Sequence, residues 1–200
     1  MNNMPVFTLS FCAVIIIIYI LDTVFLIPKT ADVTLKEKLF TGHNKGYINR
    51  ALHLSDKKIK KGEVWRLVSS ELLHVGTPHI ITNTIAMLIA GWAVESVIGS
   101  AKTLICFAGA SLISGLFMAF VYKLHEGEGA SPGIFGLIAV FIILAEKNGT
   151  VLFSAVPVYA LIILAVYTAI GLFGGKTTLC EHLSGFAGGL LTGLLLTRGM

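Results

Sequence analysis

The chain has 200 residues, of which 55% are apolar and only 13% are charged, with a formal net charge of +4. A soluble domain carries about 25% charged residues, so this composition argues against a soluble enzyme and indicates a polytopic membrane protein. The basic residues gather mostly in one loop beside apolar runs, which argues against nucleic acid as a partner.

Six apolar runs approach the length of about 20 residues that a helix needs to cross a bilayer. We therefore expect one all-α domain over residues 1–200, a polytopic bundle of six transmembrane helices. The predicted helices cover residues 6–27, 78–98, 101–122, 131–145, 151–173 and 182–197. The fourth and sixth are short, which suits helices at the centre of a bundle, where protein and water cover their ends.

The first loop, residues 28–77, contains the lysine run Lys57, Lys58, Lys60 and Lys61, which is typical of a solvated face near lipid headgroups. Trp65 and Arg66 follow. An indole ring and a guanidinium in this place are typical of an anchor at the membrane interface.

Glycines recur on one face of the sixth predicted helix, and two more open the fourth. Small residues let membrane helices approach closely, so the pattern predicts contact between these two helices. The glycines expected at the contact are Gly133, Gly136, Gly185, Gly189 and Gly193.

Four polar residues stand near the starts of the second, fourth and sixth predicted helices, which all begin on the same side of the membrane. They are His79, Asn83, Ser131 and His182. Polar groups at membrane depth are costly and so are functional candidates. A hydroxyl with an imidazole is the minimum pair for nucleophilic catalysis, and an amide with a second imidazole can donate hydrogen bonds to an oxyanion.

Other interpretations of these residues stay open at this level. Ser131 before a proline is also typical of a plain helix start, and Phe135, one turn later, can pack either against the imidazole or in the core. A proton relay through His79 and His182 would belong to a transporter. The sequence lacks HExxH and any CxxC pair, so we expect no metal, no cofactor and only packing roles for Cys12, Cys106 and Cys180.

Taken in order, these residues resemble the rhomboid family of intramembrane serine proteases, over about residues 63–196. The motifs are Trp65-Arg66, His74-x4-His79-x3-Asn83, Glu95-Ser96-Val97-Ile98-Gly99, Gly129-x-Ser131 and His182-x2-Gly185-x3-Gly189.

The resemblance implies a rhomboid-like bundle with a partly membrane-embedded first loop, and a Ser-His dyad. Ser131 would be the nucleophile and His182 the general base, acting through an acyl-enzyme on transmembrane protein substrates within the lipid bilayer. His79, Asn83 and the Ser131 N–H would form the oxyanion hole. Supporting roles fall to Phe135, Gly129, His74, Trp65, Arg66 and Glu95. The alternative is a catalytically inactive rhomboid-like protein that binds membrane helices.

Two points separate this chain from the family pattern. Many members have glycine after the nucleophile, where this chain has Pro132. The first-loop side carries 12 Lys and Arg against three on the other side, which by the positive-inside rule would place that loop in the cytoplasm. The family instead implies cytoplasmic N- and C-termini in a cell membrane, and we expect that orientation in a bacterial inner membrane.

Overall fold

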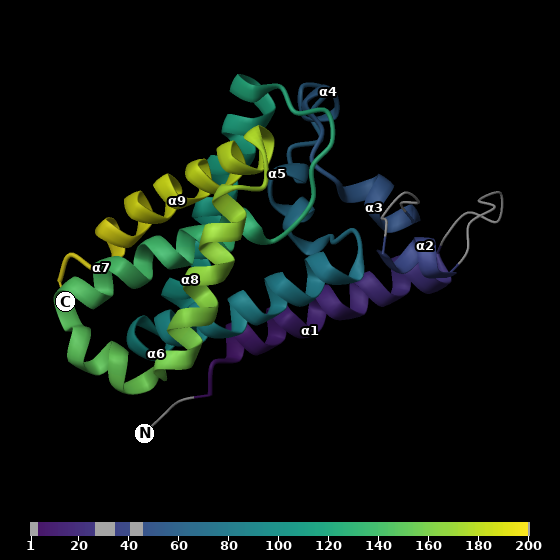
Figure 1. Ribbon diagram of the computed structural model, residues 1–200. Coiled ribbons are helices and arrows are strands. Elements are labelled where there is room, and N and C mark those ends of the chain that lie inside the picture. The colour runs from purple at the N-terminus through teal and green to yellow at the C-terminus, as the bar shows by residue number, and fades with distance from the viewer. Residues whose placement is uncertain (1–3, 27–34, 41–45, 200) are drawn as a thin grey trace.

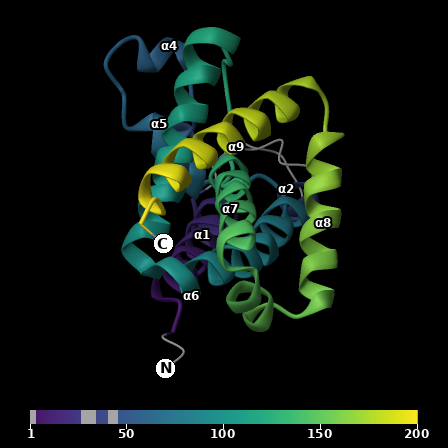
Figure 2. The ribbon, with the colours of Figure 1, turned by 90° about the vertical axis from the view of Figure 1, so that its left-hand side faces the viewer.

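The computed structural model describes residues 4–26, 35–40 and 46–199, and these segments are almost entirely helical. The long elements are α1 (Val6–Ile20), which continues as a π-helical turn η1 (Leu21–Phe25), α6 (Thr77–Leu116), which continues as η3 (Phe117–Tyr122), α7 (Ser131–Ala155), α8 (Val158–Leu172) and α9 (Lys176–Leu196). The start of α1 and the end of α9 lie at the same end of the bundle (Figures 1 and 2).

The label α6 covers two helices, which correspond to the second and third predicted helices and are separated by the non-helical backbone of Gly99. This residue has a φ of 78°, which glycine adopts without steric cost. Three helical segments have the length and hydropathy of a membrane span, namely 6–25, 77–122 and 176–196, and α8 is a shorter apolar helix. The chain is thus a helical protein with several membrane helices, and the count of six crossings stays a prediction.

Three predicted boundaries were wrong: the end of the fourth helix, the start of the fifth, which was expected at residue 151 whereas α8 begins at Val158, and the start of the sixth. The fourth helix was expected to end at residue 145, but α7 continues to Ala155 and the break falls at Pro157, because Val156 before the proline takes an extended conformation. The sixth helix was expected to start at residue 182, but α9 begins at Lys176 after Gly175, which has a φ of 100°. Hydropathy marks the apolar stretch of a helix and misses its polar first turns.

The first loop is built from short helices rather than extended chain. They are α2 (Leu35–Phe40), α3 (Tyr47–Leu52), α4 (Asp56–Ile59), α5 (Arg66–Ser69) and the 3₁₀ turn η2 (Ser70–Leu72). Residues 28–34 and 41–45 of the predicted loop lie outside the described residues. The loop residues Leu54, Ile59 and Leu67 form a small apolar cluster with Met118 and Ala119 of η3.

Arg66 corrects the interpretation of Trp65-Arg66 as a membrane-interface anchor. Trp65 is 54% exposed, as an anchor would be, but the Arg66 side chain is buried. Its Nε donates to Glu63 at 2.7 Å and its Nη1 donates to the carbonyl of His53 at 2.9 Å. A buried guanidinium needs such partners, so Arg66 holds two parts of the first loop together.

Glu95 fixes the start of α1 on α6. Its carboxylate accepts hydrogen bonds from the backbone N–H groups of Phe7 and Thr8, both at 2.9 Å, and from the Thr8 hydroxyl at 2.7 Å. The first N–H groups of a helix have no partner within the helix. Glu95 satisfies two of them from another helix, which is a structural role.

The central helix is α7, which lies among α1, α6, α8 and α9 in Figure 2. A Cβ added to Gly189 of α9 would overlap the backbone of Gly136 of α7, and one added to Gly185 would overlap the carbonyl of Pro132. Gly193 faces Val140 and Ile143 of α7. The structure thus places the predicted glycine face of α9 against α7, whereas Gly133 faces the ring of Phe107 on α6.

This close contact gives a first prediction. Gly189→Ala should lower the melting temperature in detergent, with a loss of about 1–3 kcal/mol, because the added methyl group forces two backbones apart. Gly199→Ala is the matched control, since a Cβ there meets nothing within 4 Å. Equal melting temperatures for the two variants would contradict the assignment of this contact.

Candidate active site

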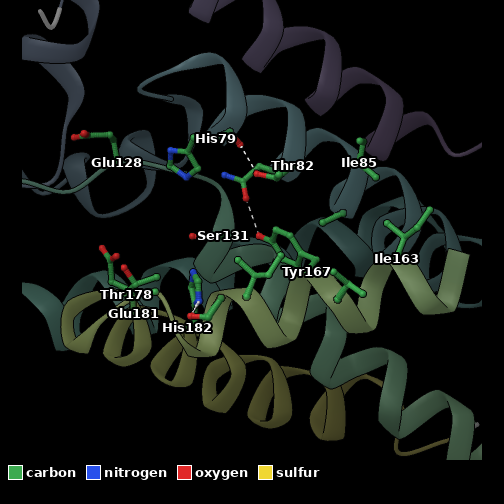
Figure 3. A pocket seen from close by; sticks show the side chains of 16 residues that line it. His79, Thr82, Ile85, Glu128, Ser131, Ile163, Tyr167, Thr178, Glu181 and His182 are labelled. Carbon is green, nitrogen blue, oxygen red and sulfur yellow. Dashed lines mark hydrogen bonds between the residues drawn. The ribbon is translucent and has the colours of Figure 1, made fainter. Parts of the chain in front are cut away.

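An open cavity of about 430 Å³ lies between α6, α8 and the N-terminal parts of α7 and α9. Figure 3 shows Ser131 between His79 on one side and His182 on the other. The lining residues are His79, Thr82, Asn83, Ile85, Ala86, Glu128, Ser131, Ile163, Val166, Tyr167, Ile170, Gly171, Gly174, Thr178, Glu181 and His182. The four polar residues predicted from the sequence therefore share one cavity.

Ser131 is the first residue of α7, and Pro132 follows it within the first turn. A proline costs nothing there, because the first N–H groups of a helix have no intrahelical acceptor. Ser131 is 9% exposed. Its hydroxyl and its backbone N–H thus lie at the positive end of the α7 dipole, where negative charge is stabilised.

Gly129 shapes the backbone just before Ser131. Its φ of 132° suits only glycine, and an added Cβ would lie 2.8 Å from the His79 ring. Its N–H donates to the carbonyl of Ser70 at 3.0 Å, and Leu54 and Gly127 form a backbone bridge nearby. The first loop therefore holds the segment that leads into Ser131.

His182 lies in the second turn of α9 and is held from two sides. Its ring stacks on Phe135, with centroids 4.0 Å apart and planes inclined by 12°. Its Nδ1 lies 3.0 Å from the carbonyl oxygen of Gly171 on α8. A carbonyl can only accept, so Nδ1 carries the proton and the neutral ring keeps its lone pair on Nε2. That is the tautomer a general base needs.

Asn83 presents its amide group to the cavity. Its Oδ1 accepts a hydrogen bond from the Tyr167 hydroxyl at 2.7 Å. Its Nδ2 is buried and has no hydrogen-bond partner within the described part of the chain. A buried donor without a partner costs free energy, so this N–H₂ group is available to an acceptor that enters the cavity.

His74 lies behind the cavity, with its ring centroid 5.1 Å from that of His79. Its Nε2 accepts from the Ala130 N–H at 3.5 Å. Burial lowers the pKa of His74 to about 3, and the neighbouring His79 acts in the same direction. The ring is therefore neutral and supports the backbone before Ser131.

The structure does not bring every predicted supporting residue to the cavity. Gly129, His74 and Phe135 contact residues that line it. Trp65, Arg66 and Glu95 are not among the lining residues. Arg66 and Glu95 instead fix the first loop and the start of α1, as described above.

The sequence analysis missed Tyr167 and Gly171, which line the cavity, and also Glu71, which does not line it but bonds the start of α7. Glu71 is buried, and its Oε2 accepts from the Gly133 N–H at the start of α7, at 3.3 Å. Tyr167 stands in an apolar run, and its hydroxyl is a signal that could have been noticed. Gly171 acts through its carbonyl, which no sequence pattern reveals.

Comparison with known proteins gives one family. The model of the rhomboid domain matches residues 61–199. The rhomboid protease GluP of Bacillus subtilis is 27% identical over 195 residues, which are 98% of this chain and 36% of that protein. The putative rhomboid protease YdcA of the same organism is 26% identical over 84% of this chain and 78% of its own length. The rhomboid protease GlpG of Haemophilus influenzae is 29% identical over 72% of this chain and 76% of its own length.

The buried carboxyl of Glu71 predicts a pH-dependent stability. Burial raises its pKa from 4.5 to about 8, the nearby Glu181 acts in the same direction, and the Gly133 N–H and the Ser111 hydroxyl partly oppose this. The folded state thus holds the proton more tightly than the unfolded state, so the free energy of unfolding falls as pH rises from 4.5 to about 8.

Glu71→Gln cannot ionise and should escape this loss. We expect the melting temperature of the wild type to fall relative to that of Glu71→Gln between pH 5 and pH 8. Glu146→Gln, which removes a carboxyl group at an exposed position on α7, is the matched control. Parallel pH curves for wild type and Glu71→Gln would refute the prediction.

Proposed function

This chain belongs to the rhomboid family, and from that premise we propose that it is an intramembrane serine protease with a Ser131–His182 dyad. The observation that carries the proposal is the shared cavity. A serine at a helix N-terminus, a histidine held in the base tautomer and a buried amide donor without a partner all line it.

The reaction follows from the chemistry of these groups. The Ser131 Oγ attacks the carbonyl carbon of the scissile peptide bond while His182 Nε2 takes the hydroxyl proton. The tetrahedral intermediate collapses to an acyl-enzyme, and the protonated His182 gives its proton to the leaving amine. Water then attacks the ester with His182 again as base, which releases the carboxylic acid and restores Ser131.

The negative oxygen of the intermediate needs hydrogen-bond donors. We assign that role to Asn83 Nδ2, His79 and the Ser131 N–H. Pro132 has no N–H, so the residue after the nucleophile contributes no donor in this chain. The positive end of the α7 dipole adds to the stabilisation.

The substrates that fit this site are transmembrane segments of other proteins. Apolar residues of α6 and α8 line the cavity beside the dyad, and among them Ile85, Ile163, Val166 and Ile170 are 41–67% exposed on the protein surface. This apolar wall suits a substrate segment that enters from the lipid, because a transmembrane segment is apolar over its length. The protein would act as a multi-pass protein of the cell membrane, with both termini in the cytoplasm.

Covalent labelling tests the nucleophile. A fluorophosphonate probe should label the wild type in detergent, and Ser131→Ala should abolish labelling. His182→Ala should slow it strongly, because the hydroxyl loses its base. Exposed Ser96 on α6 provides the control variant Ser96→Ala, which should label like the wild type.

The same experiment separates a protease from an inactive protein that binds membrane helices. An inactive protein would give no labelling that depends on both Ser131 and His182. Equal labelling of the wild type and Ser131→Ala would refute the assignment of the nucleophile.

A second variant tests the oxyanion donor. Asn83→Ala should lower the maximal rate of phosphonylation by about 10²-fold, since loss of one such donor typically costs about 10²–10³ in rate. The apparent affinity for the probe should change little, because the donor acts on charge that develops in the transition state. A rate within twofold of the wild type would remove Asn83 from the oxyanion hole.

A further inference from the structure

Asn83 can help an oxyanion only when its amide group points the right way. Its Nδ2 must face the cavity, and its Oδ1 must face away from it. In the opposite orientation a carbonyl-type oxygen would point at the developing negative charge and repel it. A neighbouring group must therefore hold the Asn83 amide in the orientation in which Nδ2 faces the cavity.

Tyr167 is placed to do this. Its hydroxyl donates to Asn83 Oδ1 at 2.7 Å, a short bond for this donor and acceptor. Oδ1 is thereby engaged, and Nδ2 is left buried without a partner on the side of the cavity. In Figure 3 the dashed line of this bond runs from Tyr167 on α8 toward α6, close to Thr82.

The rest of α8 does not explain why a polar residue stands at this position. Only Ala160 and Leu164 of α8 are buried, and most of its other side chains are exposed or half-buried. The Tyr167 ring also lies 5.7 Å from that of Phe135, which stacks on His182. One side chain thus contacts both the oxyanion side and the base side of the cavity.

We infer that Tyr167 is a positioning residue, whose hydroxyl orients the Asn83 amide as an oxyanion donor. The inference rests on the proposed function, since it requires an oxyanion at Ser131. It differs from a purely structural role for the hydroxyl, in which Tyr167 merely satisfies its own hydrogen bond and Asn83 works equally well without it.

A double-mutant cycle distinguishes the two roles, with a fluorophosphonate probe as the reagent. Tyr167→Phe keeps the ring and removes the hydroxyl. It should lower the maximal rate of phosphonylation by about three- to tenfold, the value of one hydrogen bond, and leave the probe concentration at half-maximal rate unchanged. In the Asn83→Ala background the same change should have no further effect. Tyr159→Phe, on an exposed residue of the same helix, should label like the wild type.

The outcomes separate cleanly. A rate loss of the same factor in both backgrounds would overturn the inference, because Tyr167 would then act independently of Asn83. An unchanged rate in Tyr167→Phe would overturn it as well. If Asn83→Ala labels normally while Ser131→Ala does not, the inference fails and the protease proposal stands. If Ser131→Ala labels like the wild type, both fail.

Melting temperatures of the four proteins in the cycle show whether a lower rate comes from a folding defect. If Tyr167→Phe lowers the melting temperature of the wild type and of Asn83→Ala equally, yet slows only the wild type, the effect on rate is still carried by Asn83 and supports the inference. The pH profile should keep its shape in Tyr167→Phe, because His182 remains the base. A displaced profile would place the effect on His182 and overturn the inference.

Discussion

The close contact between α7 and α9 is the constraint on which the site depends. Ser131 opens α7 and His182 lies in the second turn of α9, so their distance is set by how closely the two helices pack. Gly136 against Gly189, and Gly185 against the Pro132 carbonyl, leave no room for even one methyl group. Between membrane helices there is no hydrophobic driving force as in water, so backbone contact at small residues carries the association. The contact that packs α7 against α9 therefore also sets the distance between Ser131 and His182.

The same bundle must satisfy its buried polar groups, and it does so by tertiary hydrogen bonds. Glu95 bonds the first N–H groups of α1, Glu71 bonds the Gly133 N–H of α7, and the Gly171 carbonyl on α8 bonds His182. Each of these groups would be costly without a partner in a low-dielectric interior. The hydrogen bond that His182 Nδ1 donates to Gly171 has a chemical consequence as well, because it selects the tautomer of His182.

The sequence predicted what depends on residue type and spacing. Glycines four residues apart predicted the face of α9 that meets α7, and polar residues at helix starts predicted which side chains share a cavity. It did not predict groups that act through the backbone, such as Gly171. It also misplaced helix ends, because Lys176 and its polar neighbours extend α9 beyond its apolar stretch and Pro157, not the polar residues after Ala145, ends α7. Arg66 was misjudged because charge alone suggests exposure, whereas its partners Glu63 and His53 become visible only in the fold.

Helix α8 forms a wall of the cavity and also holds two groups of the proposed catalytic site. This helix buries few side chains against the bundle, and its apolar residues form one wall of the cavity. It also supplies the Tyr167 hydroxyl to Asn83 and the Gly171 carbonyl to His182. A displacement of α8 that admits a transmembrane segment would therefore loosen both the oxyanion donor and the base. In the proposed protease, both groups are therefore held in place only while α8 is packed as the structure shows it.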